Sequence, residues 1–595
     1  MLNREKKGKS NSNPKGGSMV CAFSSHTESP MTGCSPRSLG DCNWPQLLPS
    51  VPARLKLSLH STSPQVLSSN VTNGSVKVKA TPAKGSSTTT TTTTAVKLCL
   101  SSQSFPVVEL LPLLLSVVSL WLLQIPPPWH FADLHSRPES RHLPLLDLIS
   151  TLPDVITIMF SRHDSQPRQT LITAFIAWKA LLLAIALGSA VAPSYDTSTT
   201  LMLQRNESDI SLVTRLTRWD ALYFTQSARR GYVFEQEWAF NAGLPLVVSG
   251  LIRVARLFGF EGDGTGALEA AFSIVVAHVA HLFAALMLYE LTIKLFSRPR
   301  LAFLSTLLHI LSPAGLFLSA PYAESLCAFF SFAGYYVLAS ASTSTKGSIS
   351  WVTAQVLAGA IFGLATASRS NGLLNGLPFA VECLMILPPL LASPTSLNNI
   401  AALFGSVTGG LLVATGSVVP QALAWLRYCS GASEARAWCQ RTVPSIYSFV
   451  QEHYWGVGLF RYWTLSNVPL FILAAPVLGL LMVSGWEVIN RPSGLARSPT
   501  AEKQQQGQSG TTSVLVGSMA AAQLLLAALA ITTYHVQIIT RIASGYAVWY
   551  WWVAGCLLDD GANGKRRDIG GKVVMFSVMY AMIQGVLFAS FLPPA

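Results

Sequence analysis

Long apolar stretches dominate the chain from residue 170 onward. Eleven of them approach the roughly 20 residues that a helix needs to cross a bilayer. They lie at about 171–192, 268–293, 301–319, 323–340, 351–367, 372–392, 401–426, 465–485, 513–533, 545–558 and 572–591. A weaker run at 239–258 is interrupted by Gly243, Pro245, Gly250 and Arg253, so we expect it to be partly embedded or re-entrant. Because some stretches are short, the pattern predicts an all-α polytopic membrane protein with about eight to twelve spans.

The composition supports a membrane protein. Of the 595 residues, 50% are hydrophobic and 12% are charged, and the mean hydropathy is +0.41. A soluble domain carries roughly 25% charged residues. The net charge of +13 would suit a nucleic-acid partner, but it fits cationic cytosolic tails and loops better, so no nucleic-acid partner is expected.

The chain divides into an N-terminal extension, residues 1–165, and a multispanning domain, residues 166–595. Residues 1–100 are rich in Ser, Thr, Pro and Asn and end in a threonine run, a low-complexity composition that predicts disorder. The segment at 107–124 is apolar enough to resemble a span, but it contains Glu109 and Pro112 and is followed by three prolines. It is a membrane span, a signal-anchor or an artefact of the start site, and the sequence leaves that open.

Alternation of the spans predicts which side each loop faces. If the basic region before residue 170 is cytosolic, the first span carries residues 193–267 to the far side, and the loops rich in lysine return to the cytosol. After residue 200 the far side holds cations of one kind, arginine: Arg205, Arg215, Arg218, Arg229, Arg230, Arg369, Arg427, Arg436, Arg441, Arg461 and Arg541. A guanidinium binds phosphate in a bidentate manner, as an ammonium does not. The far face therefore predicts phosphate-bearing ligands.

Five polar islands fall on that same face, at the ends of the predicted spans. They cover residues 218–237, 312–325, 367–372, 438–455 and 534–541. Transporters place polar groups near the bilayer midplane within broken helices. Polar groups at span ends on one side instead favour a site at the boundary between lipid and lumen.

The islands resemble a known family, the second mannosyltransferase of GPI-anchor assembly (GPI mannosyltransferase 2). The shared motifs are RWDALYF, GYVFEQEWAF with GLPL, SPAGLFLSAPYAES, SRSNG, PSIYSFVQEHYWGVGLFRYW and HVQIITR. They occur in order over about residues 168–595, and one departure is Asn241-Ala242, where many relatives read Phe-Pro.

The resemblance implies a multi-pass enzyme of the endoplasmic reticulum membrane with the GT-C architecture. Such an enzyme would add the second mannose, in α1,6 linkage, to the GPI precursor from dolichyl-phosphate mannose, with no cofactor and no metal ion. Whether it needs a small membrane partner subunit stays open. Two further classes of protein remain possible: a multispanning transporter or scramblase for lipids or anions, and a noncatalytic subunit of a glycosyltransferase complex.

Asp220 is the candidate catalytic base, because a carboxylate beside an aromatic residue at the bilayer edge can take a proton from an acceptor hydroxyl. A purely structural role is also open, in which Thr217 and Asp220 form a helix capping box. The candidate substrate-binding residues are Arg218, Trp219, Glu235, Glu237, Glu324, Arg369, Gln451, Tyr454, Trp455, His535, Gln537 and Arg541. Glu235 and Glu237 are reserve carboxylates for sugar hydroxyls, or ordinary loop residues.

Several of these candidate residues have more than one possible role. Glu324 and Arg369 either serve the site or simply pair with each other. His535, Gln537 and Arg541 are candidates for the dolichyl-phosphate pocket, and Arg218 with Arg229 and Arg230 for binding phosphate or lipid headgroups. The aromatic residues Trp219, Tyr454 and Trp455 either stack on sugars or belong to an interfacial belt.

Three further features depend on the predicted topology. Cys429 and Cys439 share one far-side loop in an oxidising lumen, so a disulfide between them is plausible. Asn206 begins a far-side sequon and is a possible N-glycosylation site. Lys179 lies inside the first predicted span, where we expect its ammonium to snorkel toward the membrane surface.

Overall fold

The computed structural model describes residues 166–189, 195–203, 211–262, 264–430, 436–491, 509–559 and 565–592. Over these ranges the regular structure is helical, without a strand. Residues 1–165, with the apolar segment at 107–124, and the sequon at Asn206 lie outside the described residues.

Nine helices in the described ranges are long and apolar enough to cross a membrane, which confirms the all-α class and the predicted number. They are α3 (Pro167–Gly188), α8 (Ala267–Phe296), α10 (Glu324–Ser340), α11 (Ile349–Ser368), α12 (Leu377–Ala392), α13 (Leu397–Tyr428), α15 (Val468–Asn490), α16 (Ser509–Thr532) and α19 (Lys565–Ala589). The apolar stretches of α10 and α12 continue into the adjoining 3-10 turns η5 (Ala341–Thr343) and η6 (Ser370–Gly376).

Two of the predicted spans, 301–319 and 545–558, do not form helices long enough to be candidate spans. The first is α9 (Pro299–Ile310) followed by the turn η4 (Gly315–Leu318), and the second is reduced to α18 (Ala547–Leu557). Pro313 cannot donate a backbone hydrogen bond, and Gly315 has φ +50°, so α9 cannot continue through them. An irregular segment follows α9, and another precedes α18. These two segments contain most of the polar islands at 312–325 and 534–541.

Small residues allow close packing of the long helices. On α11, a Cβ added at Gly363 would lie 2.6 Å from the Leu412 carbonyl oxygen of α13. A Cβ added at Gly359 would overlap the backbone of Gly409 on the same helix, α13. In a membrane, helices associate through close packing of this kind, because lipid supplies no hydrophobic driving force between them.

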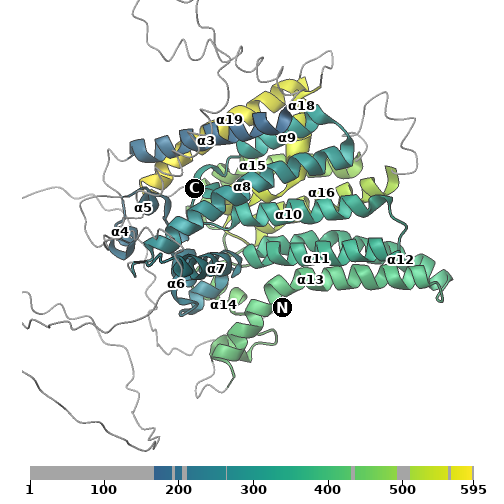
Figure 1. The fold of residues 1–595 in the computed structure, drawn as a ribbon, viewed down its shortest axis with the longest axis horizontal. Helices are drawn as coiled ribbons and strands as arrows, with labels where there is room; N and C mark the ends of the chain where they lie inside the picture. Colours follow the sequence, from purple (N-terminus) through teal and green to yellow (C-terminus); the bar gives the residue numbers. More distant parts are fainter. Residues whose placement is uncertain are drawn as a thin grey trace, which may run out of the picture. The chain divides into compact units, whose positions relative to one another are not determined.

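Several short elements gather at one end of the long helices, which we call the site end; Figure 1 labels α4, α5, α6, α7 and α14 there. They are α4 (Ser198–Leu203), α5 (Leu212–Leu216), α6 (Ala221–Arg230), η3 (Glu235–Ala239), α7 (Gly243–Leu257), α14 (Ile446–His453), η10 (Val536–Ile538), α17 (Ile539–Ile542) and η11 (Ala543–Gly545). The connections from α10 to α11 and from α12 to α13 lie at the opposite end (Figure 1).

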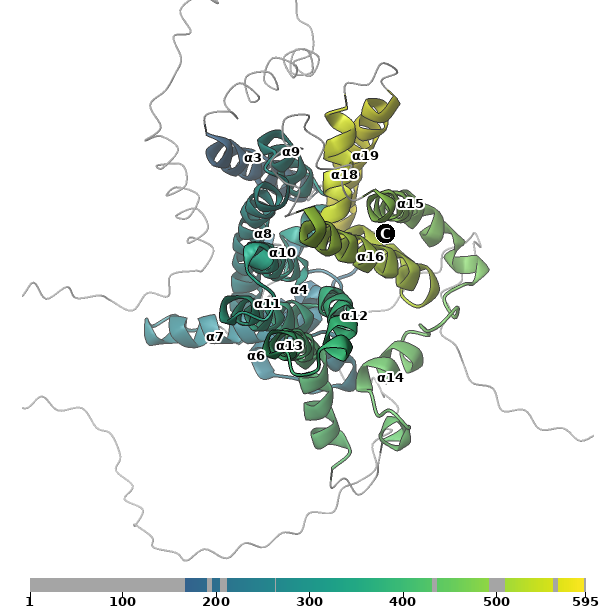
Figure 2. The same cartoon turned by 90° about the vertical axis from the view of Figure 1, so that its right-hand side faces the viewer.

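Helix α7 forms the weak apolar run at 239–258, and it is not a span. It crosses the direction of the long helices instead of following them (Figure 2). Leu244, Val248 and Ile252 face the protein, whereas Leu246, Val254 and other apolar side chains are exposed. An amphipathic helix with this pattern is typical of a membrane interface, in agreement with the expectation of partial embedding.

Candidate functional site

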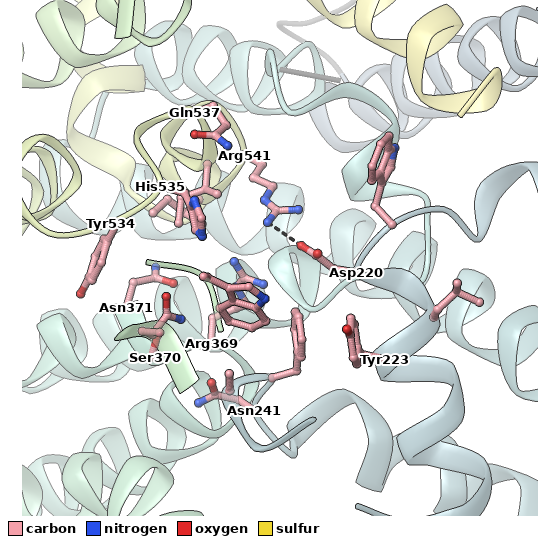
Figure 3. Close-up of a pocket in the computed structure, with 18 of the residues that line it drawn as sticks. Asp220, Tyr223, Asn241, Arg369, Ser370, Asn371, Tyr534, His535, Gln537 and Arg541 are labelled. Carbon is pink, nitrogen blue, oxygen red and sulfur yellow. Dashed lines mark hydrogen bonds and ion pairs between the residues drawn. The ribbon is translucent and has the colours of Figure 1, made fainter. Parts of the chain in front are cut away.

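A cavity of about 670 Å³ opens at the site end. Its lining comes from four of the five polar islands, which are far apart in sequence (Figure 3). The eight candidate residues that line it are Trp219, Asp220, Arg369, Gln451, Trp455, His535, Gln537 and Arg541. The fifth island, residues 312–325, contributes the buried groups that hold these side chains from beneath.

Asp220 and Arg541 lie side by side in the wall of this cavity (Figure 3). The Nη2 atom of Arg541 donates to Oδ2 of Asp220 over 2.8 Å, and the Asp220 side chain is 33% exposed. Asp220 directly precedes α6, but its carboxylate makes no capping hydrogen bond. Thr217 donates to the Val213 carbonyl instead, so the capping-box interpretation is wrong. The carboxylate is turned into the cavity because it pairs with an arginine there.

The backbone before Asp220 has an uncommon conformation. Trp219 has φ +55°, in the left-handed region that non-glycine residues rarely adopt. Such a residue costs on the order of 1–3 kcal/mol and persists only where its surroundings hold it. Its ring packs against Phe591 at 5.0 Å between centroids, and this contact fixes the turn that presents Asp220.

Arg541 links two carboxylates. Its Nε atom lies 3.4 Å from Oε1 of Glu324, and Arg369 lies 3.5 Å from the same oxygen. Charges therefore alternate from Asp220 through Arg541 and Glu324 to Arg369. Burial alone would lower the pKa of Arg541, but the neighbouring carboxylates Asp220 and Glu324 outweigh burial and raise it. The predicted pairing of Glu324 with Arg369 is present, and it belongs to a larger network that includes the cavity.

Aromatic rings support this network from below. The guanidinium carbon of Arg541 lies 4.9 Å from the ring centroid of Phe317 and 5.2 Å from that of Tyr322. The Tyr322 hydroxyl donates to the Arg218 carbonyl over 2.9 Å, which ties residues 312–325 to the turn before α6. Two aromatic faces and two carboxylates thus hold the planar guanidinium in one orientation.

Lys179 supports the same irregular segment, and the expectation that it snorkels is wrong. Its side chain is buried, and Nζ donates to the Leu318 carbonyl over 2.9 Å and to the Ser319 hydroxyl over 2.8 Å. Residues 315–323 are not α-helical, so some of their backbone groups have no hydrogen-bond partner within the segment. The Leu318 carbonyl is therefore available to accept from Lys179.

The cavity wall is rich in aromatic residues. Tyr223 stacks on Phe240 with 4.5 Å between centroids, and Phe240 meets Trp455 edge to face at 5.6 Å. His535 packs edge to face against Tyr462, whose hydroxyl donates to Gln537 over 3.2 Å. Stacked aromatic faces of this kind suit the apolar faces of a sugar ring.

The surroundings of His535 favour the neutral form of its ring. Burial lowers its pKa from the ordinary value, while Asp220 raises it and Arg541 lowers it. Its Nδ1 atom is buried without a hydrogen-bond partner among the described residues. A neutral imidazole in the cavity wall can donate to or accept from a ligand.

Five candidate residues do not line the cavity: Arg218, Glu235, Glu237, Tyr454 and the buried Glu324. Arg218 is fully buried, lies over the Phe591 ring at 4.8 Å, and donates to the Ala589 carbonyl over 3.4 Å. Burial lowers its pKa to about 10, with a further lowering from Arg215. Arg218 therefore braces the wall behind Trp219.

Glu237 has a local structural role. Its carboxylate accepts from both Nη atoms of Arg230, at 2.6 and 3.2 Å, and from the backbone N–H of Val233 and of Phe234. Its acceptor sites are directed at the turn before η3, so the chain keeps Glu237 away from a ligand in the cavity.

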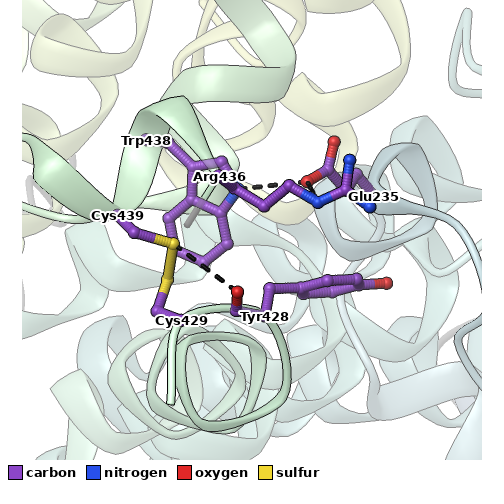
Figure 4. The surroundings of a disulfide bond; sticks show 6 residues. All are labelled: Glu235, Tyr428, Cys429, Arg436, Trp438 and Cys439. Atoms are coloured by element: carbon purple, nitrogen blue, oxygen red, sulfur yellow. Dashed lines mark hydrogen bonds and ion pairs between the residues drawn. A yellow bond between two sulfur atoms is a disulfide. The ribbon is translucent and has the colours of Figure 1, made fainter. Parts of the chain in front are cut away.

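Glu235 and Tyr454 join the loop that contains the two cysteines to η3. Cys429 and Cys439 form a disulfide in the structure (Figure 4). The neighbouring Trp438 is fully buried and donates to Glu235 over 3.2 Å, and the Tyr454 hydroxyl donates to the same carboxylate over 3.2 Å. Glu235 thus fastens α14 and the cysteine loop to the cavity wall formed by residues 239–241.

Sequence reasoning missed several residues of the lining. Among them are Asp196, Asn241 and Phe591. Asn241 departs from the family pattern, yet its Nδ2 atom donates to the Thr366 carbonyl over 2.7 Å at the cavity edge. Asp196 follows the first span on the far side, and this position was an available signal. Phe591 lies near the end of α19 and carries no local signal.

The fold and the cavity define a multispanning membrane protein with a carboxylate and two arginines gathered at the end of its helices. The chain belongs to the family described as Mannosyltransferase (PIG-V), whose model matches residues 169–595. The family expected from the motifs is therefore confirmed, and the chain is a mannosyltransferase.

Curated relatives agree with the family. GPI mannosyltransferase 2 of Gibberella zeae is 48% identical over 439 residues, covering 73% of this chain and 99% of that protein. GPI mannosyltransferase 2 of Aspergillus oryzae is 38% identical and covers 73% of this chain and 97% of that protein. Among solved structures, an Archaeoglobus fulgidus oligosaccharyltransferase tethered with an acceptor peptide matches with a TM-score of 0.36 at 13% identity, covering 73% of this chain and 56% of that chain.

Proposed function

We propose that this mannosyltransferase adds the second mannose, in α1,6 linkage, to the GPI-anchor precursor, and that dolichyl-phosphate mannose is the donor. The proposal places the reaction on the lumenal side of the endoplasmic reticulum membrane, in an enzyme of the GT-C type without a resident metal ion. Both substrates are lipid-linked, and this agrees with a site located where the long apolar helices end.

One observation carries the proposal: a carboxylate and two arginines share one cavity, connected through Glu324. In transfer, the bond between mannose C1 and the phosphate oxygen breaks, and the phosphate leaves with the bonding electrons. The acceptor hydroxyl forms the new bond to C1 and loses its proton. Asp220 is the base that takes this proton, because it is the carboxylate of the network that reaches the cavity, whereas Glu324 is buried.

Arg541 and Arg369 hold the phosphate in this mechanism. Guanidinium groups stabilise the negative charge that grows on the leaving phosphate, and removing one such donor from an active site typically costs about 10²–10³-fold in rate. When the phosphate arrives, it competes with Asp220 for Arg541. Donor binding thereby loosens the 2.8 Å ion pair and prepares Asp220 to accept a proton.

A lipid or anion transporter fits the cavity less well. A carrier site lies near the bilayer midplane and is reached from both sides. Here the charged groups of the cavity lie at one end of the helices, and the helices beneath them pack largely through aromatic and aliphatic side chains.

The test is mannose transfer by purified protein in lipid nanodiscs, with the one-mannose precursor as acceptor. Asp220→Asn should lower kcat about 10²–10⁴-fold, because a general base contributes that much. Glu382→Gln is the matched control, since Glu382 is an ordinary ion-pair carboxylate bonded to Lys346 at the opposite end. An Asp220→Asn enzyme that still makes the two-mannose product at the normal rate would remove the base assignment. Transfer by the chain alone would exclude a role as a noncatalytic subunit.

A further inference from the structure

A second hollow adjoins the cavity, and nothing in the proposed mechanism uses it. We call it the α14 groove, with a volume of about 370 Å³. Tyr447, Gln451 and Tyr534 line both the cavity and the α14 groove, so the two hollows are direct neighbours. Tyr534 lies on the opposite side of the cavity from Asp220 (Figure 3). The groove therefore leads away from the reacting carboxylate.

Helix α14 is held firmly as the partition between the two hollows. Gln421 of α13 accepts from the Ser445 hydroxyl over 3.1 Å and from the Tyr447 N–H over 3.2 Å at the start of α14. At its end, the Val457 N–H donates to the Gln451 carbonyl over 2.8 Å. Tyr447 and Gln451 are four residues apart, so they share one face of the helix.

Two charged groups line the groove, Arg461 and the carboxylate Glu452 with which it pairs. The Nη1 atom of Arg461 lies 2.8 Å from Oε1 of Glu452, and the Arg461 side chain is 56% exposed. Arg441 pairs with the other oxygen of Glu452 at 3.0 Å, but Arg441 does not line the groove. Exposed pairs of this kind contribute little to stability, so Arg461 can leave Glu452 for a stronger anionic partner at low cost.

The outer end of the groove lies at the bilayer edge. Leu459 and Phe460 lie beside Arg461 in the chain and are 68% and 58% exposed, and the apolar helix α15 begins a few residues later. The Phe460 N–H donates to the Thr532 carbonyl at the end of α16, another candidate span. Arg461 therefore lies beside the ends of two candidate spans, where lipid phosphates are expected.

We propose that the α14 groove binds the inositol-phosphate portion of the acceptor glycolipid, with Arg461 contacting the phosphodiester. This inference rests on the proposed function. The donor phosphate is bonded to the reacting sugar and must lie beside Asp220, so it belongs to Arg541 and Arg369. In a glycosylphosphatidylinositol, the phosphodiester joins inositol to the lipid at the far end of the glycan from the accepting sugar. Such an acceptor needs a second arginine, away from Asp220 and close to the membrane.

The test compares Arg461→Gln with Arg441→Gln in nanodiscs of neutral lipid. The two variants remove equivalent partners of Glu452, but Arg461 alone of the pair lines the groove. Arg461→Gln should weaken binding of the one-mannose glycolipid and raise its KM by about tenfold, as expected for loss of one charged hydrogen bond. The KM for the donor should not change. Arg441→Gln should leave both constants near wild type, and Arg461→Lys should recover part of the loss.

A phosphate-free acceptor, ending at inositol, separates the possible sources of phosphate. Wild type and Arg461→Gln should bind it equally, because Arg461 then has no acceptor phosphate to contact. A persistent difference would mean that Arg461 anchors bulk lipid headgroups, and a raised donor KM would mean that it binds the donor; each outcome overturns the inference. Equal effects of the two arginine variants would also overturn it. Because glycolipid binding is measured without turnover, failure of the proposed transfer reaction is distinguishable from failure of this inference.

Discussion

Arg541 donates to Asp220 over 2.8 Å, although 321 residues separate them in the chain. The same guanidinium lies 3.4 Å from Glu324 and rests on two aromatic rings. A lysine in its place would keep the charge but lose the planar fork that serves both carboxylates.

Arg541→Lys is therefore expected to lose most of the transfer activity. We expect kcat to fall about 10–10²-fold for Arg541→Lys and about 10²–10³-fold for Arg541→Gln, measured with saturating donor and acceptor. Arg253→Gln, which alters an exposed arginine on α7, is the control. Wild-type kcat in Arg541→Lys would mean that charge alone suffices.

Lys179, which lies in the candidate span α3, is expected to hold the segment around Leu318 and Ser319 in the geometry that the cavity needs. Lys179→Met would leave the Ser319 hydroxyl without the donor that Lys179 provides, at a cost of about 1–3 kcal/mol for an unpaired buried group. The Leu318 carbonyl would also lose Lys179 and would keep the Ser325 hydroxyl at 3.2 Å. The same segment contains Phe317 and Tyr322, the two rings against which the Arg541 guanidinium packs. We therefore expect kcat to fall about tenfold while the KM for each substrate changes little.

Two variants separate positioning by Lys179 from general stability. Ala180→Leu changes the neighbouring residue on the exposed side of α3 and should leave both kcat and the unfolding temperature in detergent near wild type. Lys179→Arg keeps a donor and should recover part of the activity. A lower unfolding temperature with unchanged kcat in Lys179→Met would reduce Lys179 to a structural role.

His535 is expected to make stability sensitive to acid. Its pKa in the folded state is lowered by burial below the value of about 6.5 in the unfolded chain. The stability that the neutral ring contributes is complete above pH 6.5 and declines as the pH falls toward the lowered pKa, because the unfolded chain then binds more protons.

The measurement for His535 is the unfolding temperature at pH 7.5 and at pH 5.5. His535→Gln should show a smaller drop between the two pH values than wild type. His453→Gln, which alters an exposed histidine of α14, serves as the comparison and should keep the wild-type drop. An identical drop in all three proteins would show that His535 does not titrate differently on folding.

The disulfide is expected to order the cysteine loop without taking part in transfer. Cys429 and Cys439 are 10 positions apart, and closing a loop of that size is worth about 2–3 kcal/mol in the chain-entropy model. In Cys429→Ser with Cys439→Ser, amide hydrogen exchange should rise in residues 436–455, because Trp438 and Glu235 lose their fixed geometry. Cys383→Ser, which removes a cysteine that is not in a disulfide, is the control. Unchanged exchange in the double variant would contradict this role.

Hydrophobic patterning determined the class of the protein and the positions of most spans. A span must satisfy its own backbone and present apolar side chains to lipid, so about 20 apolar residues suffice to specify it. The sequence-based prediction of a span was wrong where the helix is broken, at Pro313 and Gly315. An apolar run does not show whether neighbouring helices cover backbone groups that a broken helix leaves unpaired. The sequence also determined the family, since the motifs are long and occur in order.

Tertiary structure alone decided which polar residues act together. Glu235 and Glu237 look equivalent in sequence, but neither carboxylate lines the cavity. Glu237 pairs with Arg230, and Glu235 accepts hydrogen bonds from Trp438 and Tyr454. Lys179 looked like a snorkelling residue because its partners are 139 and 140 residues away. Partners of buried charges are chosen by packing between distant segments, and local sequence carries no record of that choice. For the same physical reason, Asp220 could be recognised as a candidate base from its motif, whereas its pairing with Arg541 could not.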